Sequence, residues 1–192
     1  MLINTRRGYG LVTILFHWTI APIVIAQLLL GFVMLRLADQ RSAFELIQLH
    51  KSIGFLILAL VIPRLLWRLA SVTPEHPAGM SPHERLVAQL SHFALYGLMI
   101  GLPLSGWILV SVSTLGIVTL AFNKIIISNL PLATSDFAES LWSWIHAILA
   151  FVAAALIVLH LCAALWHQFL RRDDLLSRII FPAREERSGP PR

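Results

Sequence analysis

The sequence predicts an all-α membrane protein whose fold is a bundle of four transmembrane helices. Hydrophobic residues make up 57% of the 192 residues and charged residues only 13%, about half the charged fraction of an average soluble protein. The mean hydropathy is +0.77. Long apolar stretches alternate with short polar segments, which leave no room for a separate soluble domain. We therefore expect a single transmembrane domain over residues 1–192.

Each of four apolar stretches is long enough to cross a bilayer, which takes about 20 residues of helix. Polar residues such as Asn123, Lys124 and Pro131 interrupt the segment 111–139. We expect this segment to be a long connection, partly folded on or into the membrane surface. A basic tail follows the last stretch at residues 171–192. The predicted spans are residues 11–35, 46–67, 85–110 and 141–168.

Lysine and arginine residues predict the orientation of the bundle, because they are enriched in the cytoplasmic segments of membrane proteins. With four spans, the amino end, the middle loop and the carboxyl end share one side, which holds eleven of the 15 basic residues. Both termini are therefore expected in the cytoplasm, and the net charge of +5 needs no nucleic-acid partner. The eleven are Arg6, Arg7, Arg64, Arg68, Arg85, Arg171, Arg172, Arg178, Arg184, Arg187 and Arg192, and the other four are Arg36, Arg41, Lys51 and Lys124.

Ionisable residues inside an apolar span are costly and indicate a functional site. His146 and His160 are 14 residues apart in the fourth span, so they leave the same helix face about 21 Å apart. His17 is expected at the depth of His160, and His50 at the depth of His146. Two facing pairs suit two haems with two histidine ligands each. The single cysteine, Cys162, excludes covalent haem attachment of the c type, which needs Cys-x-x-Cys-His.

Several residues keep two interpretations on the sequence alone. A hydrogen-bonded core histidine is the alternative for each histidine taken singly, whereas zinc catalysis needs three ligands at one depth. Gly54, one turn after the second-span histidine, serves either a close haem or helix packing. Arg64 and Arg68 suit either haem propionates or interfacial positions. Gly97 and Gly101 fit small-residue helix packing.

Five stretches together resemble the bacterial cytochrome b561 family, the short four-helix di-haem b cytochromes, over nearly the whole chain. The resemblance implies two haem b groups and identifies His167 as a quinone contact. His92 lies in the cytoplasmic layer and is open to three roles: hydrogen bonding to a propionate or quinone, replacement ligand, or packing. The stretches are FHW at 16–18, HKSIG at 50–54, RLLWRL at 64–69, SHFALYGLMIGLPLSGW at 91–107 and SWIHAILAFVAAALIVLH at 143–160. The family's iron ligands fall on His17, His50, His146 and His160.

The resemblance implies transmembrane electron transfer in the bacterial inner membrane. Within the family, the sequence is most similar to members that oxidise superoxide at the periplasmic face and reduce ubiquinone. Arg41 and Lys51 are then candidates for steering the superoxide anion. The alternative is a cytochrome b membrane subunit that relays electrons between a dehydrogenase or hydrogenase partner and quinone. Expected partners are membrane lipid, quinone, and either superoxide or a redox protein as donor.

The orientation is testable with reporter fusions. The split of basic residues predicts that a reporter at the carboxyl end is active on the cytoplasmic side and that a reporter at Asn123 is active on the periplasmic side. Reporters that work only in one compartment, inserted at both positions, measure this directly. The opposite result at either position would invert the depth assignments.

Overall fold

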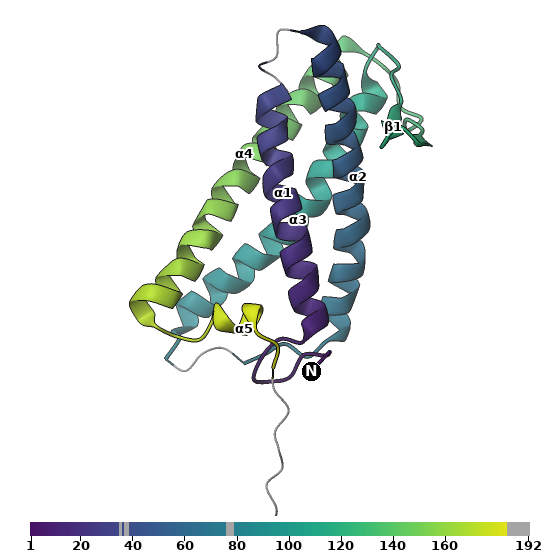
Figure 1. Ribbon diagram of the computed structural model, residues 1–192. Helices are drawn as coiled ribbons and strands as arrows, with labels where there is room; N and C mark the ends of the chain where they lie inside the picture. Colours follow the sequence, from purple (N-terminus) through teal and green to yellow (C-terminus); the bar gives the residue numbers. More distant parts are fainter. Residues whose placement is uncertain (35, 37–38, 76–78, 184–192) are drawn as a thin grey trace, which may run out of the picture.

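The structure is a computed structural model that describes residues 1–34, 36, 39–75 and 79–183. Three of the basic residues used for the orientation, Arg184, Arg187 and Arg192, lie outside the described residues. The remaining part of the chain forms four long helices, a small β-hairpin and a short carboxyl-terminal helix (Figure 1). The elements are α1 (Leu11–Met34), α2 (Gln40–Ala70), α3 (Pro82–Val112), β1 (Thr119–Ala121), β2 (Ile125–Ile127), α4 (Asp136–Trp166), the π-helix η1 (His167–Arg171) and α5 (Ser177–Ile180).

The predicted four-helix membrane bundle is confirmed. All four long helices are apolar enough and long enough to cross a membrane, and their apolar side chains point outward as lipid requires. Leu29, Phe151 and Leu159, for example, are each 60–64% exposed. The buried core is small and centres on Ile20, Ile57 and Val61, while α1 packs on α2, α2 on α3 and α3 on α4, with little contact between α1 and α4.

Three of the four long helices, α2, α3 and α4, begin before the predicted spans because polar residues cap them. Ser81 and Glu84 form a capping box at the start of α3, with Pro82 in the first turn, and this arrangement satisfies backbone groups that no helical bond reaches. Asp39 accepts a hydrogen bond from the backbone N–H of Ser42 at 2.9 Å and starts α2. These first turns are polar, so hydropathy alone does not include them in the spans.

The connection after α3 contains a β-hairpin that the sequence did not predict. Thr119 pairs with Ile127 and Ala121 with Ile125 in antiparallel register. Three-residue strands are too short to be stable alone, so the hairpin depends on polar side chains of α2. Their bonds run from Gln48 Nε2 and Lys51 Nζ to the Val118 carbonyl (3.2 and 3.3 Å), from Leu120 N to Gln48 Oε1 (3.2 Å) and from Phe122 N to Ser52 Oγ (3.0 Å).

The amino and carboxyl segments meet at the end of the bundle opposite the hairpin (Figure 1). The Met1 ammonium donates to the Ala183 carbonyl at 3.0 Å, and Ala183 N donates to the Tyr9 carbonyl at 2.9 Å. The Trp18 indole N–H of α1 donates to the Ile179 carbonyl of α5 at 2.9 Å. The middle loop joins them, because Glu75 N donates to the Arg6 carbonyl at 2.8 Å. Both described end segments and the middle loop therefore cover one end of the bundle.

Candidate functional site

Each long helix carries two residues, each a histidine, a glycine or an arginine, that are 14 positions apart and lie on one face of the helix. Because consecutive helices run in opposite directions, these positions gather at two depths about 21 Å apart. We call the group nearer β1 and β2 the hairpin layer and the group nearer the chain ends the terminal layer. The hairpin layer consists of Gly31, His50, Gly106 and His146, and the terminal layer of His17, Arg64, His92 and His160.

The hairpin layer brings together the predicted pair His50 and His146. Their ring centres are 6.2 Å apart and the ring planes meet at 83°. This separation leaves room for both rings to bind one metal ion, since metal–imidazole nitrogen bonds are about 2.0–2.1 Å long. The other two helices contribute glycines beside these rings. A Cβ at Gly31 would lie 3.3 Å from His50 Cε1, and a Cβ at Gly106 would lie 3.2 Å from His146 Cε1.

Polar neighbours prepare one of these histidines for metal binding. Ser105 Oγ donates to the Leu102 carbonyl at 2.8 Å, so its single proton is used there. It lies 2.8 Å from His146 Nδ1 and therefore accepts a hydrogen bond from this nitrogen. With the proton on Nδ1, the Nε2 lone pair of His146 is available to a metal, which is the usual second-shell arrangement.

Buried polar atoms without hydrogen-bond partners lie at the other histidine of the pair, His50. His50 Nδ1 and Gln27 Oε1 are both buried without a hydrogen-bond partner, although Gln27 Nε2 donates to the His50 carbonyl at 2.7 Å. Buried polar atoms are rarely left unpaired, because each costs about 1–3 kcal/mol. Such orphaned atoms beside a paired histidine fit a site that is completed by a bound group.

The terminal layer holds three histidines and one arginine. The rings of His92 and His160 are 5.6 Å apart, while Arg64 Nη2 lies 3.3 Å from His17 Nδ1. His17 is close enough to the other three residues to interact with each electrostatically. The structure thus places the predicted partners His17 and His160 in one layer, but the ring that lies against His160 is that of His92. The pairing of His17 with His160 stays a prediction.

Two arginines of α2 lie against one tyrosine at this depth. The guanidinium carbons of Arg64 and Arg68 are 5.4 and 5.7 Å from the centre of the Tyr96 ring. Neither has a carboxylate partner in the described part of the chain. Tyr9 lies near them, and burial raises the pKa of its phenol, against the lowering effect of the Arg68 charge. Two half-buried cations without counterions fit anionic groups such as haem propionates.

The contact between Arg64 and His17 would change if iron bound. A guanidinium only donates hydrogen bonds, so His17 Nδ1 accepts in this contact and its proton is on Nε2. An imidazole that binds iron through Nε2 keeps its proton on Nδ1. Arg64 would then have to release His17 and would be available to a propionate. The donor sets of both layers therefore fit haem, and in the terminal layer the contact between Arg64 and His17 would have to change.

The structure gives the glycines other roles than the sequence analysis expected. The packing role assigned to Gly97 and Gly101 is wrong for this bundle, because a Cβ at either would meet no described atom within 4 Å. Both therefore lie on an open face of α3. A Cβ at Gly54 would lie 3.7 Å from Gln27 Nε2, an ordinary contact. The close approaches are at Gly31 and Gly106, which the sequence analysis did not single out.

The residues suggested for steering an anion lie at the hairpin end of α2. Arg41 is exposed and pairs with Glu45 at 3.3 Å. Lys51 directs its ammonium to the Val118 carbonyl at 3.3 Å, so it also fastens the hairpin. In the described part of the chain neither contacts His50 or His146. The structure therefore does not support a direct role for these two residues at the histidine pair. Their positive charges could still attract an anion to this end of the bundle from a distance.

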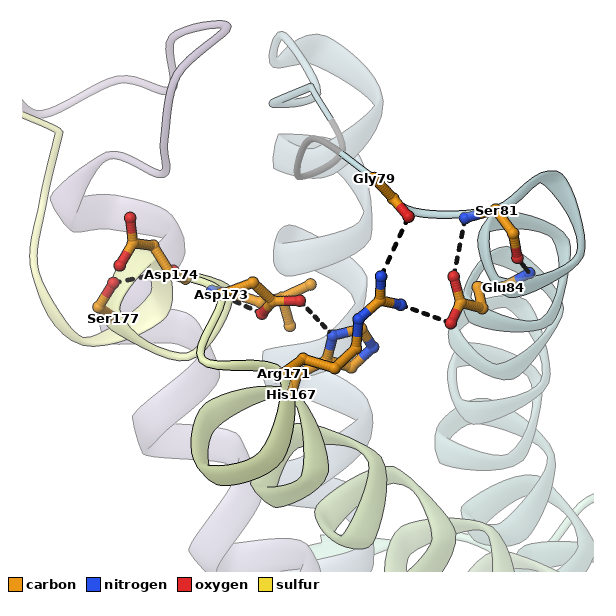
Figure 2. Close-up of polar contacts among 9 residues, drawn as sticks. Gly79, Ser81, Glu84, His167, Arg171, Asp173, Asp174 and Ser177 are labelled. Carbon is orange, nitrogen blue, oxygen red and sulfur yellow. Dashed lines mark hydrogen bonds and ion pairs between the residues drawn. The ribbon is translucent and has the colours of Figure 1, made fainter.

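His167 opens the π-helix η1 at the terminal end of α4, and it is only 8% exposed. Its Nδ1 lies 2.6 Å from Asp173 Oδ2 (Figure 2). Next to it, Arg171 donates to Glu84 Oε1 at 2.5 Å and to the Gly79 carbonyl at 3.0 Å. These bonds fasten the end of α4 to the start of α3. Local π-helices often occur at functional sites.

The sequence analysis missed several residues of these sites. Gly31 and Gly106 carry a signal that was available, namely the 14-residue spacing from the histidines at positions 17 and 92. A glutamine inside the apolar first span was a second signal, because intramembrane polar residues are costly. Ser105 and Asp173 had no such signal, because only the folded chain brings them to their histidines.

A four-helix membrane bundle with stacked layers of facing histidines defines a membrane cytochrome. A sequence model of the family described as prokaryotic cytochrome b561 matches residues 8–182, and the chain belongs to this family. It is 33% identical over 179 residues to "Cytochrome b561 homolog 2" of Escherichia coli (strain K12), which covers 92% of this chain and 93% of the relative. It is 30% identical over 176 residues to "Probable superoxide oxidase CybB" of Yersinia pestis, which covers 91% of this chain and 97% of the relative.

The family establishes the general class of activity. The chain is a multi-pass bacterial membrane protein for electron transport, and its cofactor is haem b. The haem supplies one-electron chemistry, and the protein supplies ligands, position and charge. The number of haems, their ligands and the electron donor and acceptor are matters for proposal.

Ligand variants test the layers. Two non-covalent b haems per chain are expected. His50→Ala or His146→Ala should remove one, and His17→Ala or His160→Ala the other, because each variant deletes a strong axial ligand. Pyridine haemochrome assay gives the stoichiometry and the visible spectrum identifies the remaining haem. His92→Ala should retain both. Loss of the same haem in His17→Ala and His146→Ala would refute the pairing by depth.

A pair of glycine variants tests the haem space itself. Gly106→Leu should lower the content from two haems to one, because even the Cβ would already stand 3.2 Å from the His146 ring. Gly101→Leu, on an open face of the same helix, should retain both. Haem content per chain measures the difference. Equal content in the two variants would show that no haem lies against Gly106.

Proposed function

We propose that the protein transfers electrons across the membrane through two haems, one in each layer, from superoxide to ubiquinone. The observation that carries the proposal is the pair His50 and His146, whose ring centres are 6.2 Å apart with a glycine beside each ring. His50 and His146 would hold one iron, and His17 and His160 the other. Two histidine ligands to each iron would favour electron transfer over binding of an external ligand.

The donor side of the proposal is the hairpin end. Superoxide is an anion, and the exposed Arg41 together with the Lys51 ammonium gives this end positive charges that attract it. The likeness to a relative named as a probable superoxide oxidase supports the same donor. Glu45 pairs with Arg41, so the local attraction is moderate. Superoxide loses one electron there and leaves as dioxygen.

The acceptor side is the terminal end, where His167 is the proposed quinone contact. Asp173 holds Nδ1 of His167, which fixes the ring and leaves Nε2 to face a quinone carbonyl oxygen. The clamp between Arg171 and Glu84 keeps this end of α4 in place. Two superoxide ions supply two electrons, and the quinone takes up these electrons and two protons to give quinol and two dioxygen molecules. A histidine at hydrogen-bond distance is a suitable proton donor.

The reaction is tested by mixing purified, haem-loaded protein with superoxide under anaerobic conditions and following the haem absorption bands. Superoxide should reduce the haem, and added ubiquinone should re-oxidise it. His167→Ala should be reduced normally but re-oxidised about tenfold more slowly or worse, because it lacks the proposed proton donor. His83→Ala, an exposed histidine at the same end, is the matched control.

The outcome decides between the two functions predicted from the sequence. Haem that superoxide does not reduce would refute the proposal and favour the alternative of a membrane subunit that relays electrons between a dehydrogenase or hydrogenase partner and quinone. Re-oxidation at the normal rate in His167→Ala would remove His167 from the quinone site without affecting the donor side.

A further inference from the structure

The two layers use the same positions on the four helices but fill them differently. In the hairpin layer, α1 and α3 contribute Gly31 and Gly106 beside the paired histidines. In the terminal layer, the two positions not assigned to iron are occupied by Arg64 and His92. At these positions one layer therefore has no charge, and the other includes a permanent positive charge.

The charge of Arg64 is held inside the bundle. Its side chain is half-buried, its Nη2 lies 3.3 Å from His17 Nδ1, and its guanidinium carbon lies 5.4 Å from the Tyr96 ring centre. No carboxylate neutralises it in the described part of the chain. A charge in such surroundings is screened less than a fully exposed one.

Among the described residues, no cation is recorded against His50 or His146 in the way that Arg64 lies against His17. Lys51 follows His50 in sequence, but its ammonium is bound to the Val118 carbonyl on the hairpin side. Arg41 is solvent-exposed and paired with Glu45. Exposed charges are screened by salt and water. The electrostatic potentials at the two depths therefore differ in the direction that favours negative charge in the terminal layer.

We propose that Arg64 gives the haem of the terminal layer a higher reduction potential than the haem of the hairpin layer, so that electrons run from the hairpin end to the terminal end. This inference rests on the proposed function, which places a haem in each layer. Reduction adds one electron, and a nearby cation stabilises the reduced state. Arg64 is thus a residue that sets the direction of transfer and does not touch the donor.

The sign of the effect does not depend on where the guanidinium settles when haem binds. If it releases His17 Nδ1 but stays in the terminal layer, its charge acts on the iron directly. If it moves to a propionate, it cancels a negative charge that would otherwise disfavour the reduced state. In both arrangements, removal of the positive charge lowers the potential of the terminal-layer haem.

Redox titration of the purified, haem-loaded protein tests the inference. The wild type should show two one-electron transitions, and single-haem variants assign them: the haem left in His50→Ala should have the higher midpoint and the haem left in His17→Ala the lower. Arg64→Gln should lower the higher midpoint by about 59 mV, which is a tenfold change in the equilibrium constant for one electron. The lower midpoint should not change.

Two further variants control for a general effect. Arg64→Lys keeps the charge and should retain most of the midpoint difference. Arg85→Gln removes one positive charge at the same end of the bundle from a side chain that donates to the Met80 carbonyl, and neither midpoint should move. These readouts are potentials of the bound haem and do not depend on superoxide or quinone turnover.

Each outcome supports or overturns the inference. A higher midpoint in the hairpin layer would overturn it whatever Arg64→Gln does, and this measurement needs no arginine variant. A shift of both midpoints together, or no shift, in a haem-loaded Arg64→Gln would also overturn it. A wild type with one haem would refute the proposed two-haem function itself, which haem content reveals before any titration.

Discussion

The structure depends on one constraint: a helix in lipid has no solvent for its polar side chains, so each one must point inward and find a partner at its own depth. Four antiparallel helices with polar or glycine positions 14 residues apart meet this constraint twice, at two depths. The apolar remainder faces outward, as the exposure of Leu29 and Leu159 shows. Function and folding therefore use the same few residues, because the polar groups that need partners are the ones that suit an iron-binding group.

The ends of the bundle are built differently from its middle. At one end Gln48, Lys51 and Ser52 hold a short hairpin over α2, and at the other the amino segment, middle loop and α5 close together. Both assemblies are held by hydrogen bonds to backbone groups, and these groups need partners wherever they are removed from water. The end of α4 belongs to this system, because the bonds of Arg171 and His167 keep η1 against α3. The proposed donor and acceptor would each meet a different assembly.

The two layers differ in the residues that surround the histidines, so the residues proposed to bind iron are not the ones proposed to set the direction of electron transfer. Iron binding needs two histidines close to one another, which the hairpin layer shows for His50 and His146 and which stays a prediction for His17 and His160. The proposed direction of transfer needs a difference between the depths, and the difference lies at the positions not assigned to iron. These positions are Gly31 and Gly106 at one depth and Arg64 and His92 at the other. Second-shell groups adjust cofactors in this way without changing their ligands. Ser105 shows the same principle for the proton of His146.

The sequence by itself determined the membrane class, the four helices and the grouping of His17 with His160 and of His50 with His146 by depth. Hydropathy and the 1.5 Å helical rise act locally and need no knowledge of neighbours. It also contained the spacing that identifies Gly31 and Gly106. Only the tertiary structure decided that His160 meets the His92 ring, that Ser105 reaches His146, and that Gly97 and Gly101 face open space. The hairpin at 119–127 belongs to the same group, since its strands are stabilised by α2 across some 70 residues of chain. Contacts between helices depend on rotation and crossing, and local periodicity does not specify either.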